Sequence, residues 1–393
     1  MTILLKNGNL DVRIENGVIT EVGIGLQSVS DKIIDCSGLT VIPGICDMHV
    51  HFRDPGQTHK EDIFSGSEAA AAGGVTAAMC MPNTNPVIDT PKAVRAFTER
   101  SEEAKIKIYP CAAITKGLNG KELTDFKALK TAGAIAVSDD GMPVSDVRRM
   151  SEAMALAEQT GLRIISHCEA FDINTRLSEN VITARELCLA ENLGVPVHIA
   201  HVSTKESAAY VKIAKNRGVK ITCEAAPHHF TLTETELQKR DADYKMNPPL
   251  REQDDVSAVV AALRDGVIDC IASDHAPHSM SEKSDFDSAP NGVLGLETIL
   301  AVTLTRLYHT EQLSLDRIIE LLCVNPRRIL EIPGGSLRAG SPADIAVVDL
   351  NEEWVVEPDE LCSKSRNTCF KGMKLKGKVK LTLVDGEVVY DGT

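Results

Sequence analysis

Short apolar runs alternate with helical stretches through the middle of the chain. The runs occupy residues 44–51, 75–81, 106–112, 134–138, 162–167, 196–202, 219–224 and 268–274. Their cores are apolar at successive positions, which is typical of strands whose two faces are both covered. Glycines that can end the helix before a run stand at Gly74, Gly133, Gly161, Gly194, Gly218 and Gly266. This pattern predicts an α/β fold, a (β/α)8 TIM barrel, which helical stretches near 293–308 and 314–331 would close.

The two ends of the chain have a different pattern, with short alternating strands. Residues 15–17 (ENG) and 385–386 (DG) are turn sequences typical of β-hairpins. Since both ends lie outside the barrel, we expect them to pair. The prediction is a small β-sandwich domain from residues 1–43 plus 336–393, and a barrel domain from residues 44–335.

Composition and charge narrow the function classes. The chain has 393 residues, of which 43% are hydrophobic and 25% charged, as in a soluble globular protein. The net charge of -14 argues against nucleic acid and against an anionic membrane surface as partners. The eleven cysteines never form a CxxC pair, and most lie within apolar runs. With no export signal or long apolar segment recognised, we expect a cytoplasmic protein with reduced thiols.

Histidine and aspartate recur where the apolar runs end. His49 and His51 lie two apart on one run, so their side chains point to the same side. Taken alone, that pair is better explained as two polar residues on a half-buried strand. However, other runs end at His167, His201 and Asp274, and one leads into Asp139 and Asp140. Because the carboxyl ends of barrel strands meet at one face, the pattern predicts a metal site there.

Four imidazoles and two carboxylates suit one or two borderline divalent ions, with Zn²⁺ as the first choice. We assign the bridging position to Asp140, with Asp139 as the alternative, because adjacent strand residues face opposite ways. A metal pair makes a hydroxide nucleophile from water, which indicates hydrolysis of a carbonyl compound. Asp274 would be the general acid/base; the alternative for Asp274 is a helix N-cap.

Three further residues are candidate substrate contacts. Arg53 lies two residues after His51, and its guanidinium can grip a carboxylate, although a solvated loop arginine is the simpler alternative. Asn83 follows a strand end and is either a substrate contact or a turn residue before proline. His278, four residues after Asp274, could complete an anion pocket. We do not assign His59, His198 or His309 to the site, because they fit a surface, an opposite-face and a helix position, respectively.

Seven segments of the sequence resemble the class I dihydroorotases, which are members of the metal-dependent amidohydrolase superfamily. The resemblance extends over nearly the whole chain. Its segments are 43–56 (PGICDMHVHFRDPG), 81–84 (MPNT), 138–141 (SDDG), 201–205 (HVSTK), 227–229 (PHH), 244–251 (YKMNPPLR) and 274–278 (DHAPH).

This resemblance implies a ligand set and a reaction. His49, His51 and Asp274 would bind the first metal, Asp140 would bridge, and the second metal would be held by His167 and His201. The implied substrate contacts are His51, Arg53, Asn83, Asn247, His278, Asn291 and Gly292. The implied reaction is the reversible cyclisation of N-carbamoyl-L-aspartate to L-dihydroorotate, a step of pyrimidine biosynthesis, with Asp274 as general base.

Two features need separate interpretation. His228 and His229 end the seventh run, but the superfamily pattern takes no ligand from that strand, so we interpret them as supporting or structural residues. The segment from His167 to His201 is shorter than in class I relatives. We expect this shortening to alter the local contacts beside the site and a subunit interface there, while no ligand residue is lost.

Two rival functions remain. A hydantoinase, dihydropyrimidinase or allantoinase would usually carry a carboxylated lysine where this chain has Asp139 and Asp140, and would lack Arg53. A non-catalytic scaffold for aspartate carbamoyltransferase would typically have lost ligands, whereas all six are present here. We expect a small-molecule substrate and a homodimer, with aspartate carbamoyltransferase as a candidate partner.

Overall fold

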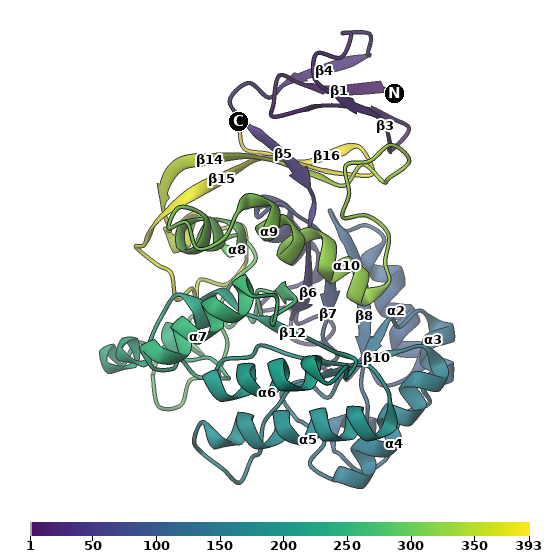
Figure 1. Cartoon of the computed structure of the whole chain (residues 1–393), viewed down its shortest axis with the longest axis vertical. Helices are drawn as coiled ribbons and strands as arrows, with labels where there is room; N and C mark the ends of the chain where they lie inside the picture. The colour runs from purple at the N-terminus through teal and green to yellow at the C-terminus, as the bar shows by residue number, and fades with distance from the viewer. Residues whose placement is uncertain (1) are drawn as a thin grey trace.

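The computed structural model describes residues 2–393 and contains a barrel below a pair of sheets (Figure 1). Eight parallel strands form the barrel in sequence order. A parallel bridge between Val50 and His275 links the first barrel strand to the segment that follows the last barrel strand, and this bridge closes the barrel. The strands are β6 (Ile45–Val50), β7 (Val75–Cys80), β8 (Lys107–Ala112), β9 (Ala136–Val137), β10 (Arg163–Ser166), β11 (Val197–Ile199), β12 (Ile221–Ala225) and β13 (Cys270–Ile271).

All eight predicted strands are present, so the predicted fold class is confirmed. β9 and β13 are shorter than their apolar runs, although flanking residues still hydrogen-bond to the neighbouring strand, as Ser138 N–H does to Ala112 and Ala272 N–H to Ala225. Gly161 and Gly194 end α4 and α5 in the left-handed conformation, with φ of 68° at both positions, as predicted.

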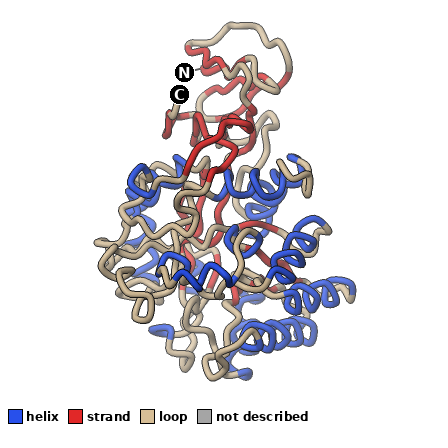
Figure 2. The backbone as a smooth tube through the Cα atoms, turned by 90° about the vertical axis from the view of Figure 1, so that its left-hand side faces the viewer, coloured by secondary structure: helices blue, strands red, loops and turns tan. Residues whose placement is uncertain are grey.

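Helices surround the barrel, as Figures 1 and 2 show. The helices on its outside are α1 (Ile63–Ala72), α2 (Pro91–Ser101), α3 (Phe126–Ala132), α4 (Val147–Thr160), α5 (Leu177–Leu193), α6 (Lys205–Asn216) and α7 (Gln253–Arg264). Short 3-10 turns occur at Lys116–Leu118, Pro227–Phe230, Glu234–Lys239, Ala242–Tyr244 and Pro358–Glu360. None of the helices formed by residues 2–393 is both long and apolar enough to span a bilayer.

The two predicted closing helices are interrupted. The first begins later than expected, as α8 (Ile299–Thr303), and continues through a π-helical turn at Leu304–Tyr308. The second comprises α9 (Leu315–Ile319), a π-helical turn at Glu320–Val324 and α10 (Asn325–Leu330). α10 contacts β6 and β13, and its Ile329 and Leu330 pack against the apolar interior of the barrel. It therefore plugs the end of the barrel opposite the strand carboxyl ends.

The segments that flank the barrel form two four-stranded sheets. One has the order β3-β2-β1-β4, with β1 (Thr2–Lys6), β2 (Asp11–Glu15), β3 (Val18–Gly23) and β4 (Lys32–Asp35). The other has the order β16-β15-β14-β5, with β5 (Thr40–Pro43), β14 (Ile345–Val355), β15 (Lys374–Val384) and β16 (Glu387–Asp391). Both predicted hairpins are present, since Glu15 pairs with Val18 and Val384 pairs with Glu387.

Two features of these outer parts bear on the site. Apolar side chains of both sheets share one core, so the first and last segments of the chain pack together. The connection from β14 to β15, residues 356–373, leaves its sheet and reaches the barrel mouth (Figure 1).

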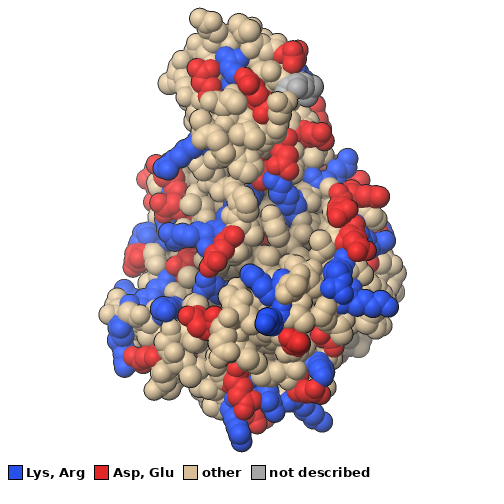
Figure 3. All heavy atoms as spheres, turned by 90° about the vertical axis from the view of Figure 1, so that its right-hand side faces the viewer, with Lys and Arg blue, Asp and Glu red and all other residues tan. Residues whose placement is uncertain are grey.

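On the face in Figure 3, acidic and basic side chains are interspersed.

Candidate metal centre and active site

The strand ends bring the six predicted ligand residues together. His49 lies on β6 and His51 just after it, and His167 follows β10 directly. The other three lie within three residues of a strand end and are Asp140 after β9, His201 after β11 and Asp274 after β13. All six side chains are buried, with at most 7% exposure. Their convergence follows from the barrel, which gathers the strand carboxyl ends at one mouth.

Asp140 lies at the centre of this cluster. Its Oδ1 is 3.3 Å from His49 Nε2 and 3.4 Å from His167 Nδ1, and its Oδ2 is 3.5 Å from His51 Nε2. Asp139 instead accepts a hydrogen bond of 2.9 Å from the backbone N–H of Thr115. Of the two aspartates left open by the sequence, Asp140 is therefore the one that faces the histidines.

Asp274 completes the group on the β6 side. Its Oδ1 is 3.3 Å from His51 Nε2 and 3.6 Å from His49 Nε2. His167 Nδ1 is 3.0 Å from His201 Nε2 on the other side. Ligand atoms bound at 2.0–2.2 Å in a tetrahedron lie about 3.4 Å apart, so these spacings fit a cation with nitrogen and oxygen ligands.

Outer hydrogen bonds hold one ring nitrogen of three histidines, so that the other nitrogen of each faces the cluster. His49 Nδ1 is 2.7 Å from Glu224, and His51 Nδ1 is 2.8 Å from the Asn83 amide oxygen. His167 Nε2 is 2.9 Å from Glu169. When these outer nitrogens carry the proton, the inner ones present lone pairs. His49 Nε2 is buried with no hydrogen-bond partner, which is the signature expected of a metal-binding nitrogen.

The electrostatics of the cluster favour ionised carboxylates. Burial would raise the pKa of Asp274, but a hydrogen bond with His51 and the charge of His49 lower it below its usual value. The pKa of Asp140 is likewise raised by burial, yet the charge of His49 and the contact with His167 lower it strongly. Both aspartates are therefore available as anionic ligands.

Three residues at the mouth have backbone conformations that are unusual for side chains other than glycine. The φ angles are 57° at Arg53, 31° at His201 and 51° at Asp274. Such conformations cost about 1–3 kcal/mol each and cluster at functional sites. Here they turn the chain sharply at strand ends so that each side chain faces the mouth.

A cavity of about 200 Å³ opens beside the ligand cluster. All the predicted substrate contacts line it, namely His51, Arg53, Asn83, Asn247, His278, Asn291 and Gly292. The Asn83 amide reaches both His51 and Asp140, and Asn247 donates a hydrogen bond of 2.9 Å to Glu169. At Gly292, with φ of 138°, an added Cβ would lie 2.7 Å from the Ala276 carbonyl oxygen.

Arg53 is a buried cation without a carboxylate partner. It is 8% exposed, and its Nε donates to the Pro277 carbonyl at 3.1 Å. Its Nη2 lies 3.2 Å from His278 Nε2. Across residues 2–393, no acidic side chain pairs with Arg53 within 4.0 Å. Burial, followed by the charges of Arg53 and Lys60, lowers the pKa of His278 to about 3, so this corner of the cavity strongly favours an anion.

The sequence interpretation missed three residues that support the site. Glu224 on β12 contacts His49, and His198 Nε2 lies 3.1 Å from its other oxygen. Glu169 contacts His167, and Asn367 reaches the mouth from the β14 to β15 connection. Glu224 could have been found from the sequence, because it is a charged residue within the apolar run 219–224. No local sequence pattern points to Asn367.

His228 and His229 are buried in a 3-10 turn after β12. His229 Nε2 lies 2.9 Å from the Pro248 carbonyl oxygen. Neither histidine belongs to the two groups of facing ligand atoms that share Asp140.

Comparison with known proteins agrees with this geometry. The amidohydrolase family model matches residues 40–389. The chain is 46% identical to a protein named dihydroorotase from Geobacter metallireducens, over 97% of this chain and 95% of the relative. It is 43% identical to another, from Trichlorobacter lovleyi, over the full length of both chains.

Among solved structures, the L-hydantoinase from Arthrobacter aurescens is similar with a TM-score of 0.92 and 25% identity, over 100% of this chain and 96% of that one. The fold is thus shared with hydantoinases, while the relatives of much higher sequence identity are dihydroorotases. The chain belongs to the amidohydrolase family and, within it, to the dihydroorotases.

Proposed function

We propose that this protein is a dihydroorotase, which catalyses the reversible cyclisation of N-carbamoyl-L-aspartate to L-dihydroorotate in pyrimidine biosynthesis. The observation that carries the proposal is Arg53, a buried cation without a carboxylate partner in the same cavity as Asp274. A substrate carboxylate would supply the missing counter-charge, and both substrate and product carry one.

The ligand cluster supports Zn²⁺ as the cofactor. His49, His51 and Asp274 would hold one ion, and His167 and His201 would hold a second, with Asp140 between them. Imidazole and carboxylate ligands suit this ion. When bound, one or two such ions would activate water and polarise the reacting carbonyl group.

Asp274 is positioned to transfer the proton. In ring opening, a water oxygen bonds to the ring carbonyl carbon, and the bond from that carbon to the ring nitrogen breaks. The Asp274 carboxylate takes the proton from water and passes it to the leaving nitrogen. Ring closure follows the same path in reverse, with Asp274 taking the proton from the ureido nitrogen.

The substrate carboxylate would bind at Arg53, with Asn83 and His278 beside it. Arg53 is held by the Pro277 carbonyl, so its guanidinium is oriented before substrate arrives. The ring would lie against Asn247, Asn291 and Gly292, where the absence of a side chain at Gly292 leaves room.

The direct test is an assay of purified protein in both directions, paired with metal analysis. We expect turnover of dihydroorotate and of carbamoyl aspartate, loss of activity with a chelator, and recovery with Zn²⁺. Activity on dihydrouracil or hydantoin that equals or exceeds activity on dihydroorotate would show that the substrate assignment is wrong. Protein that binds no zinc and stays inactive after zinc is added would indicate a scaffold.

Replacing Arg53 tests the carboxylate site. We expect Arg53→Ala to lower kcat/KM for dihydroorotate by about 30-fold or more, because a buried charge-assisted pair contributes roughly 2–5 kcal/mol. Arg100→Ala is the control, since Arg100 pairs with Asp54 at 2.6 Å and does not line the cavity. Equal losses in the two variants would contradict the proposed role of Arg53.

We also propose that the protein is a cytoplasmic homodimer. Support for the dimer comes from a group of half-exposed apolar side chains around the starts of α4 and α5, namely Met142, Val147, Phe171, Leu177 and Val181. The eleven unpaired cysteines are consistent with a reducing compartment. Light scattering of the purified protein, alone and with aspartate carbamoyltransferase, distinguishes a dimer from a monomer and from a mixed assembly.

A further inference from the structure

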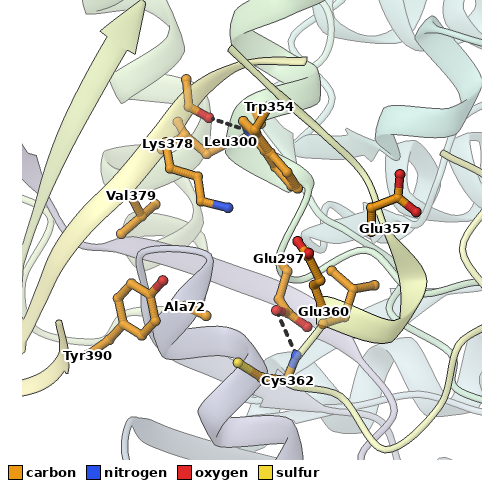
Figure 4. A pocket seen from close by; sticks show the side chains of 13 residues that line it. Ala72, Glu297, Leu300, Trp354, Glu357, Glu360, Cys362, Lys378, Val379 and Tyr390 are labelled. Atoms are coloured by element: carbon orange, nitrogen blue, oxygen red, sulfur yellow. Dashed lines mark hydrogen bonds between the residues drawn. The ribbon is translucent and has the colours of Figure 1, made fainter. Parts of the chain in front are cut away.

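The connection between β14 and β15 forms a strap over the barrel mouth, and we use this name for residues 361–370. Its first residues are tied to the barrel by Glu297. The Glu297 carboxylate accepts hydrogen bonds from the backbone N–H groups of Cys362 at 2.9 Å and Ser363 at 3.2 Å. Figure 4 shows Glu297 directed at Cys362, beside Trp354 at the end of β14.

A second set of bonds fixes the middle of the strap. The buried carboxylate of Glu61 accepts from the Ser363 hydroxyl and from the Lys364 backbone N–H. The Ser365 hydroxyl donates to the Lys60 carbonyl at 2.7 Å. The strap is therefore held against the barrel before it reaches the substrate cavity.

Asn367 is the strap residue that meets the wall of the cavity. Its side chain is buried, and its Oδ1 accepts from the His278 backbone N–H at 3.1 Å. Its Nδ2 donates to the carbonyl oxygens of Ala276 at 3.2 Å and Gly292 at 3.0 Å. The amide thus bonds to three backbone groups, and its backbone carbonyl accepts from Leu294.

All three partners of the amide belong to residues that line the cavity. The carbonyl of Pro277, in the middle of the 276–278 segment, accepts from Arg53. This short segment is consequently held by Arg53 on one side and by Asn367 on the other. Moving it would shift both His278 and the partner that orients Arg53.

We propose that Asn367 is a positioning residue for the substrate carboxylate. It fixes the 276–278 segment and Gly292, so that Arg53 and His278 are oriented to bind the substrate carboxylate. This inference rests on the proposed function. It assigns a substrate-binding role to a residue outside the barrel that touches no reacting atom.

The test compares Asn367→Ala with Ser365→Ala in the full-length zinc-loaded enzyme. Ser365 is a matched control, because it lies on the same strap, is also buried, and its hydroxyl bonds to the Lys60 carbonyl and not to the 276–278 segment. We expect Asn367→Ala to raise KM for dihydroorotate roughly tenfold while kcat falls less than about threefold, as loss of uniform binding requires. Ser365→Ala should leave both constants near wild type.

Competitive inhibitors show whether the carboxylate site is what changes. Orotate carries the carboxylate and uracil lacks it. In Asn367→Ala, the inhibition constant of orotate should rise with KM, and that of uracil should stay unchanged. Equal weakening of both inhibitors, or wild-type constants in the variant, would overturn the proposal.

Two further measurements apply if Asn367→Ala does not fold or if the wild-type enzyme is inactive. If Asn367→Ala does not fold, Asn367→Asp keeps the shape and the acceptor for His278 but loses the donors, and the same KM shift is expected. If the wild-type enzyme is inactive on dihydroorotate, the proposed function fails, and a crystal structure of the variant still tests the positioning. Residues 276–278 and 292 in unchanged positions would overturn it.

Discussion

At the scale of single residues, Glu224 illustrates how the site depends on groups behind the ligands. Its two oxygens lie 2.7 Å from His49 Nδ1 and 3.1 Å from His198 Nε2. Burial would raise the pKa of Glu224, but the charge of His49 and the hydrogen bond to His198 lower it to about 2. The carboxylate therefore stays charged and holds His49 with its other nitrogen toward the metal.

We expect Glu224→Gln to weaken zinc binding by about 10–100-fold, because loss of the group behind a metal-binding histidine typically has that effect. The measurement is a zinc titration against a competing chelator. Glu186→Gln is the matched control, since Glu186 is also fully buried but bonds to Ser166 and Arg185 rather than to a ligand. Equal zinc affinities in the two variants would contradict this role for Glu224.

At the scale of elements, α10 connects the barrel to the outer sheets. Arg327 on this helix is 1% exposed, and its Nη2 donates to the Thr76 hydroxyl on β7 at 2.6 Å. Its Nη1 lies 3.4 Å from Asp344, which directly precedes β14. The helix therefore fixes the closed end of the barrel, while the opposite end carries the chemistry.

Arg327→Met should lower the free energy of unfolding by roughly 3–5 kcal/mol, because it removes one partner of a buried ion pair. Denaturant unfolding of the zinc-loaded protein measures the change. Arg328→Ala, an exposed neighbour on the same helix, should change it by less than about 0.5 kcal/mol. A small loss of unfolding free energy in Arg327→Met would mean that the ion pair with Lys107 is enough to compensate the buried charge of Asp344.

At the scale of the whole molecule, stability is linked to protons and metal at the mouth. In the metal-free protein, burial would lower the pKa of His167, but its contacts with Asp140 and Glu169 raise it to about 9 from the ordinary 6.5. Protonated His167 thus favours folding. Its contribution is fully present below pH 6.5 and is lost as the pH rises toward 9.

We therefore expect the Tm of chelator-treated protein to fall between pH 6.5 and 9, a range taken from this pKa shift. Zinc should have the opposite dependence, because His167 must lose its proton to bind the ion, so zinc raises the Tm more at higher pH. Thermal unfolding with and without zinc measures both effects. Glu169→Gln should make the slope of the metal-free protein shallower, and an unchanged slope would contradict the role of His167. His49 contributes in the same direction, since burial would lower its pKa but Asp140 and Glu224 raise it.

Much of this molecule is determined locally and was predictable from the sequence. Apolar runs with both faces buried, separated by helices, specify parallel strands, and a parallel barrel gathers their ends at one mouth. His49 and His51 face one side because strand residues alternate. Those rules act over a few residues, so the strands, the hairpin turns at Gly17 and Gly386 and the meeting of the ligand residues follow from the sequence.

Other features were decided only by tertiary structure. Asp139 and Asp140 are indistinguishable in sequence, and the fold turns only Asp140 toward the histidines because Thr115 binds Asp139. The π-helical turns beside α8 and α9 lie in helical stretches that the sequence pattern shows as continuous. Asn367 meets His278 across 89 positions of the chain. Contacts between residues so far apart leave no periodic pattern in the sequence, because packing of the completed barrel against its sheets creates them.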